Sequence, residues 1–147
     1  MLVPLDGSSL AEAALEPALA LARGFDSQVV LLRVVAPAEL EFSGGLYALS
    51  RVWEQQERQA ARAYLETVRT RCGLPRNTHL VVEMGTAPTT IIATAVRLSV
   101  SLIVMSTHSR SGVGRLLYGS VAEAVVRATT VPVLLAPGRY QTLTLAE

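Results

Sequence analysis

A run of small residues between two apolar segments carries the strongest chemical signal in the sequence. It is Ser106-Thr107-His108-Ser109-Arg110-Ser111-Gly112-Val113-Gly114-Arg115-Leu116-Leu117-Tyr118-Gly119-Ser120. A predicted helix follows at Val121, and the free N–H groups and positive dipole at a helix start attract anions. Gly119 lets the backbone come close to such a ligand, and the Ser120 hydroxyl can cap the helix or donate to a phosphate oxygen. The segment therefore predicts a site for a nucleotide phosphate.

Three further charged or ionisable side chains are candidates for the same site. Arg110 and Arg115 could neutralise phosphates, although single arginines are more often simply solvated. His108 has no carboxylate near it in sequence to orient it as a general base. We therefore assign no catalytic residue.

Composition excludes several classes of chemistry. All 13 basic residues are arginine, so the lysine of a phosphate loop and every Schiff-base lysine are missing. Two aspartates, two histidines and the single cysteine Cys72 are too few for an EF-hand, a zinc site or an iron–sulfur cluster, so no metal site is expected.

The overall balance of the chain predicts one domain over residues 1–147. Half of the residues are hydrophobic and the formal net charge is +1, which disfavours partners such as nucleic acid or an anionic membrane surface. A lone cysteine fits a reducing compartment, and no apolar run approaches the roughly 18 residues of a membrane span. We expect a cytoplasmic protein.

Short apolar runs alternate with segments of helical period along the chain. The predicted strands are Leu2–Leu5, Gln28–Val35, His79–Met84, Ser101–Met105 and Val131–Ala136, and the predicted helices are Ser9–Arg23, Leu49–Arg71, Pro88–Leu98 and Ser120–Ala128. Strands that alternate with helices form a parallel sheet between two helix layers, an α/β fold. Ligands of such sheets bind beyond the carboxyl ends of the strands, which is where Asp6 and Ser106 lie.

The first helix has recognisable boundary signals. Ser9 with Glu12 three residues later predicts a capping box, and Gly24 is placed to end the helix. Pro17 inside it predicts a lost hydrogen bond and a slight kink.

Several short motifs together resemble the universal stress protein family over almost the whole chain. They are Val3-Pro4-Leu5-Asp6-Gly7-Ser8, Leu31-Leu32-Arg33-Val34-Val35, Gly85-Thr86-Ala87-Pro88, Gly119-Ser120-Val121-Ala122-Glu123 and Val131-Pro132-Val133-Leu134-Leu135. The resemblance implies a doubly wound, Rossmann-like or flavodoxin-like three-layer sandwich with five parallel strands in the order 3-2-1-4-5. It also implies a homodimer joined through the last strand, Val131 to Ala136.

One branch of that family binds ATP through Gly-x-x-Gly followed, nine residues later, by Gly-Ser or Gly-Thr. The spacing is present here, but serines replace both leading glycines: Ser106-x-x-Ser109, nine residues, then Gly119-Ser120. The resemblance implies that Asp6 accepts hydrogen bonds from the ribose hydroxyls and that the Val34 main chain meets the adenine edge. The implied ligand is ATP or another adenine nucleotide, with or without Mg²⁺, and the implied contacts also include Met105, Ser106, Ser109, Gly119, Ser120 and Val121.

Two functions remain open on the sequence. The first is a regulatory module that binds an adenine nucleotide, and the second is a nucleotide-free dimeric stress-response protein that acts through protein contacts after losing the glycines. An enzyme ranks below both, because no positioned base is evident and slow ATP hydrolysis is the most we expect.

Overall fold

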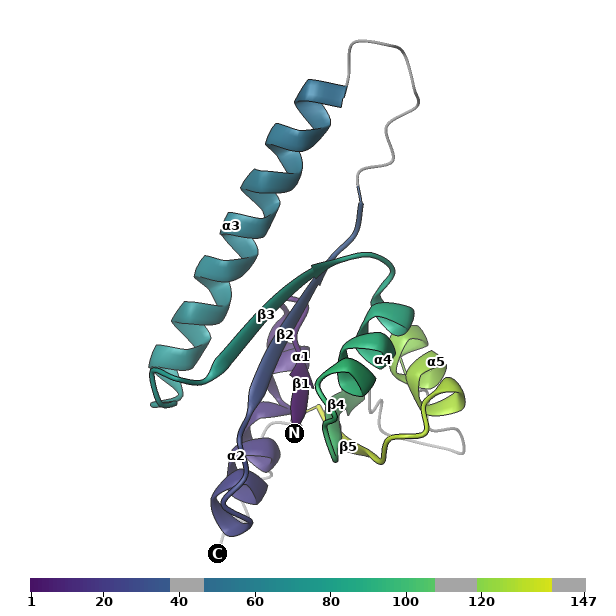
Figure 1. Cartoon of the computed structure of the whole chain (residues 1–147). Coiled ribbons are helices and arrows are strands. Elements are labelled where there is room, and N and C mark those ends of the chain that lie inside the picture. The colour runs from purple at the N-terminus through teal and green to yellow at the C-terminus, as the bar shows by residue number, and fades with distance from the viewer. Residues whose placement is uncertain (38–46, 108–118, 139–147) are drawn as a thin grey trace, which may run out of the picture.

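A computed structural model describes residues 1–37, 47–107 and 119–138 (Figure 1). Its centre is a sheet of five parallel strands in the order β3-β2-β1-β4-β5, as the family resemblance implied. The strands are β1 Leu2–Pro4, β2 Val30–Val35, β3 His79–Met84, β4 Ile103–Thr107 and β5 Val133–Pro137. Three of the predicted strands begin two residues too early, before β2, β4 and β5.

Helices cover both faces of this sheet and create two cores. The helices are α1 Ser9–Glu12, α2 Leu15–Gly24, α3 Tyr47–Arg71, α4 Ala87–Arg97 and α5 Ser120–Ala128. Successive strand residues point to opposite faces, so Val3 packs in the core under α2 and α3 while Leu2 packs in the core under α4 and α5. Both side chains are fully buried, which explains why the strand sequences are continuously apolar.

The predicted helix Ser9–Arg23 is in fact two helices, and the capping prediction was wrong by one residue. Ser8 is the N-cap, because its Oγ accepts a hydrogen bond from the Ala11 N–H at 3.1 Å. The helix is interrupted between α1 and α2, so Pro17 lies in the first turn of α2. The N–H groups of a first turn have no partner within the helix, so the N–H that proline lacks costs no helical hydrogen bond there. The kink expected at Pro17 is replaced by this break upstream of it.

The end of α2 also differs from the prediction in detail. Gly24 is the last helical residue, and the left-handed conformation that ends the turn belongs to Asp26, with φ 48°. Aspartate tolerates this region better than most residues with a side chain.

Helix α3 is much longer than the strands it covers, and its first half extends past the sheet in Figure 1. Its buried residues, Ala61, Leu65 and Val68, all lie in its second half. Trp53, in the first half, is half-buried and is not among the side chains that pack against either core. Within the described ranges, no helix is both long enough and apolar enough to cross a membrane.

Candidate functional site

A cavity of about 300 Å³ opens at the carboxyl edge of the sheet and brings together most of the residues singled out in the sequence. Its lining includes seven of the eight predicted nucleotide contacts: Asp6, Val34, Met105, Ser106, Gly119, Ser120 and Val121. The eighth, Ser109, and the two arginines considered as phosphate contacts, Arg110 and Arg115, lie outside the described residues. Four separate segments of the chain thus converge on one cavity.

The remaining lining residues were not predicted, and they make much of the wall apolar. They are Pro4, Leu5, Leu10, Ala11, Ala87, Ile91 and Ala122, from β1 and its following loop and from α1, α4 and α5. The motif Gly85-Thr86-Ala87-Pro88 follows β3 directly, so its position could have indicated that Ala87 lies at the cavity. The cavity is suited to a ligand with an apolar, flat part and a polar part, as most small-molecule sites are.

The start of α5 forms one end of the cavity. Gly119 is the N-cap with φ −56° and ψ 148°, and no side chain caps the helix. The first helical N–H groups therefore have no partner within the helix, and they face a ligand-sized space. Other residues adopt this backbone conformation readily, so the φ angle of Gly119 does not by itself require a glycine.

Ser106 occupies the position of the first motif glycine, and it lies in strand β4 in register with Ala136. Among the described residues, positive φ angles outside glycine occur only at Asp26 and Ser99. The serine at position 106 is therefore accommodated without backbone strain, and its half-buried side chain lines the cavity.

Asp6 is fixed by a tight local turn at the end of β1. Its Oδ1 accepts two hydrogen bonds from Ser8, from the N–H at 2.8 Å and from Oγ at 2.6 Å. Partial burial acts to raise the pKa of the carboxyl, but the Ser8 bonds and the positive charge of Arg33 outweigh it and lower that pKa below its ordinary value. Asp6 is therefore an ionised acceptor at neutral pH.

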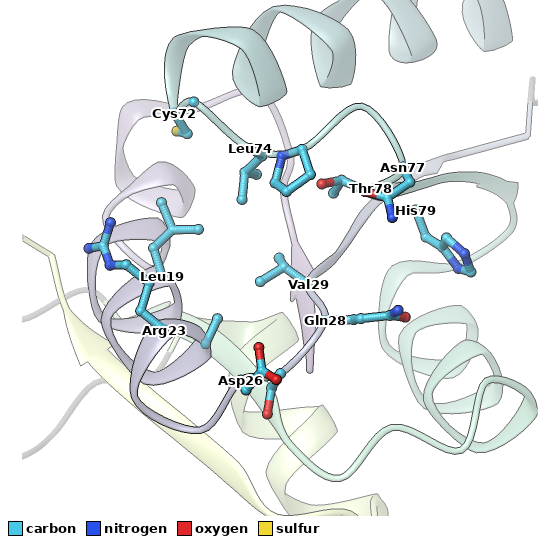
Figure 2. A pocket seen from close by; sticks show the side chains of 14 residues that line it. Leu19, Arg23, Asp26, Gln28, Val29, Cys72, Leu74, Asn77, Thr78 and His79 are labelled. Atoms are coloured by element: carbon cyan, nitrogen blue, oxygen red, sulfur yellow. The ribbon is translucent and has the colours of Figure 1, made fainter.

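A second cavity, of about 370 Å³, lies at the opposite edge of the sheet (Figure 2). It sits where the chain enters β2 and β3, and Figure 2 shows Leu19, Val29 and Leu74 pointing toward one another across it. Gln28 and His79 flank its other end. Parallel α/β sheets bind their ligands at the carboxyl ends of the strands, so we place the functional site in the first cavity.

Metal binding by protein side chains has little support in the described part of the chain. No three histidine, cysteine, aspartate or glutamate residues there lie close enough together to hold a metal ion. Asp6 is the single carboxylate among the described residues that line the first cavity.

Comparison with known proteins identifies the family. The family model described as "Universal stress protein family" matches residues 1–137. The chain belongs to the universal stress protein family. A universal stress protein of Methanocaldococcus jannaschii is 30% identical over 142 residues, which cover 92% of this chain and 79% of the relative. A universal stress protein of Thermus aquaticus is 30% identical over 138 residues, covering 92% and 96% of the two chains.

Solved universal stress protein structures have the same fold. The protein UspA from Lactobacillus plantarum superimposes with a TM-score of 0.73 at 22% identity, covering 92% of this chain and 94% of that one. A universal stress protein solved in complex with cAMP superimposes with a TM-score of 0.62 at 19% identity, covering 94% and 95%. At these identities the likeness concerns the fold alone.

Proposed function

We propose that this universal stress protein is a regulatory module that binds ATP or another adenine nucleotide in the cavity at the carboxyl edge of the sheet. The observation that carries the proposal is the convergence of Asp6, Val34, Ser106 and the start of α5 on that one cavity. That a relative of the same fold was solved with cAMP supports the class of ligand.

The base, the ribose and the phosphates of a nucleotide would each meet residues of suitable chemistry in the cavity. The adenine ring would lie against the apolar side formed by Val34, Ile91 and Met105, with its polar edge toward the β2 main chain. Asp6 would accept hydrogen bonds from the ribose hydroxyls, and the N–H groups at the start of α5 would donate hydrogen bonds to phosphate oxygens. Mg²⁺, where it accompanies the nucleotide, would be bound mainly by the phosphates, because Asp6 alone does not make a metal site.

We further propose that two chains pair through β5, and that the module works in the cytoplasm, as its lone cysteine suggested. β5 is an edge strand, and its residues Val133, Leu134 and Leu135 are only half-buried. An apolar edge strand with free backbone groups favours pairing with another strand.

The direct test is calorimetric titration of the purified chain with ATP, ADP, AMP and cAMP. We expect saturable binding of at least one of them, and loss of that binding in Gly119→Val, because a branched side chain at the helix start fills the phosphate end of the cavity. The matched control is Gly24→Ala, since an added Cβ at Gly24 has no other atom within 4 Å and lies away from the cavity. Unaltered binding in Gly119→Val would contradict the proposed site.

The serines that replace the motif glycines call for a second set of variants, Ser106→Gly and Ser106→Gly with Ser109→Gly. If the serines are compatible with phosphates, both variants bind about as well as the natural chain or better. If only the double variant binds, the serines closed the site. If no form binds at millimolar nucleotide, the nucleotide-free dimeric protein is the correct alternative.

A further inference from the structure

The guanidinium of Arg33 lies beneath the turn that carries Asp6. Arg33 is on β2, and because side chains alternate along a strand it projects to the opposite face from Val34, its neighbour in the cavity wall. Its Nη1 makes a long hydrogen bond, 3.5 Å, to the main-chain oxygen of Leu5. Arg33 therefore contacts the last residue before Asp6 without lining the cavity itself.

Gly7, on the other side of Asp6, also meets this guanidinium. A Cβ added to Gly7 would lie 3.8 Å from Nη2, 3.9 Å from Cζ and 4.0 Å from Nη1 of Arg33. Nearly equal distances to three atoms of a planar group mean that the flat face of the guanidinium is turned toward Gly7. Gly7 itself has φ 89°, a conformation that suits glycine, and it allows this close stacking.

Arg33 differs from the other described arginines in combining partial burial with the lack of an ion pair to a described carboxylate. Five arginines of the described residues have a carboxylate of another described residue within 4 Å, namely Arg62, Arg69, Arg71, Arg97 and Arg127. The other described arginines have none, but Arg33 is half-buried whereas Arg23, Arg51, Arg58 and Arg76 are exposed. Asp6 feels its charge at longer range. A half-buried cation is stabilised by acceptors near it. Those that the described residues offer to Arg33 are the Leu5 oxygen and, at longer range, the Asp6 carboxylate.

We propose that Arg33 is a positioning residue of the nucleotide site, which supports the Leu5–Gly7 turn from below and holds the Asp6 carboxylate in place for the ribose hydroxyls. This inference rests on the proposed function. It adds a residue outside the cavity, on the other face of the sheet, whose effect passes through Asp6 and not through direct contact with the nucleotide.

The test is a mutant cycle measured with two ligands, ATP and 2′,3′-dideoxy-ATP, which lacks the ribose hydroxyls. Arg33→Met removes the charge at similar length, and we expect it to weaken ATP binding by about three- to tenfold, the usual range for one lost polar interaction. Arg33→Lys should restore part of the affinity. Asp6→Asn should weaken ATP binding as well, and Arg33→Met should add little in the Asp6→Asn background, because residues that act through one another are not additive.

The second ligand separates positioning from general damage to the fold. The natural chain and Arg33→Met should bind dideoxy-ATP with almost equal affinity, because this ligand has no ribose hydroxyl that could donate a hydrogen bond to Asp6. The matched control is Arg97→Met, which removes an arginine paired with Glu83 between α4 and β3. It should leave the affinity for both ligands unchanged.

The possible results distinguish failure of the positioning role of Arg33 from failure of the proposed nucleotide binding. Additive losses in Asp6→Asn and Arg33→Met, or equal losses for ATP and dideoxy-ATP, would overturn the positioning role while leaving the proposed function intact. A natural chain that binds no adenine nucleotide would overturn the proposed function and this inference with it. A readout without ligand is the Asp6 carboxyl resonance followed by NMR over pH, which should titrate at higher pH in Arg33→Met.

Discussion

At the scale of single residues, Asp6 links the site to the pH dependence of stability. Its pKa in the folded chain lies below its ordinary value of 3.8, because the Ser8 hydrogen bonds and the Arg33 charge outweigh the effect of burial. A carboxyl with a lowered folded pKa stabilises the fold fully above pH 3.8, and the contribution is lost as the pH falls through the folded pKa. The Asp6 contribution is therefore present at neutral pH and disappears in acid.

We expect Asp6→Asn to lower the free energy of unfolding at pH 7 by less than about 1 kcal/mol, since the carboxylate is exposed and water screens it. The difference from the natural chain should shrink below about pH 4, where the natural carboxyl is itself being protonated. Urea unfolding at several pH values measures both quantities. A cost that stays constant down to pH 2 would show that Asp6 does not act through its charge.

Residues at the carboxyl ends of strands were predictable as cavity residues, and the family motif indicated the start of α5, but the cavity residues on α1 were not predictable. Asp6 and Ser106 could be placed because the carboxyl ends of parallel strands meet at one edge of a sheet. Leu10 and Ala11 reach the cavity from α1, a helix of a single turn that ends before Pro17. Pro17 indicated a disturbance of the predicted helix, but periodicity in the sequence did not show that two separate helices would form.

At the scale of elements, α1 is held against α3 by a small polar cluster. Glu12 of α1 accepts a hydrogen bond from the Tyr64 hydroxyl at 2.9 Å and pairs with Arg71. Burial and the Glu12 carboxylate raise the pKa of Tyr64, so its hydroxyl stays protonated and remains a donor. The sequence suggested that Glu12 belongs to a capping box, but in the structure its carboxylate bonds to side chains of α3 instead.

Tyr64→Phe should therefore lower the free energy of unfolding by about 1 kcal/mol, the typical net value of one hydrogen bond whose partner is left half-buried. Chemical denaturation followed by circular dichroism measures the change. The control is Glu123→Gln, which breaks an exposed pair with Arg127 one helical turn away and should cost less than about 0.5 kcal/mol. Equal costs for the two variants would mean that the Tyr64 bond contributes no more than a surface pair.

At the scale of the whole molecule, the backbone pattern of β5 provides a test of the proposed dimer. Ile103 N–H donates to the oxygen of Pro132, and Gly138 N–H donates to the oxygen of Thr107. Because a parallel ladder uses alternate residues, the N–H of Leu134 faces β4 and that of Val133 points out of the sheet.

Val133→Pro removes an outward donor and should yield a folded monomer, whereas Leu134→Pro breaks the ladder to β4 and should unfold the chain. Light scattering after size exclusion should give about twice 15.7 kDa for the natural chain and about 15.7 kDa for Val133→Pro. If the natural chain is a monomer at micromolar concentration, pairing through β5 is wrong.

The number of strands and their alternation with helices could be predicted from periodicity, because each buried strand is a short continuous apolar run. The strand order required the family resemblance, since any order that keeps right-handed crossovers satisfies the same pattern. The bounds of α3 were predicted to within two residues. Its extension past the sheet was not predicted, because helical period alone does not show where the sheet beneath a helix ends.

The overhang of α3 implies that one helix contains two regions of very different opening free energy. Around Leu65 and Val68, which are fully buried, amide hydrogens should exchange with solvent only when the core opens. Ahead of Ala61 the described side chains are exposed or half-buried, and Val52 is 55% exposed, so those turns depend largely on their own helical propensity. The amide hydrogens of these turns should therefore exchange far faster. Slower exchange there would show that another molecule has bound over the first half of α3.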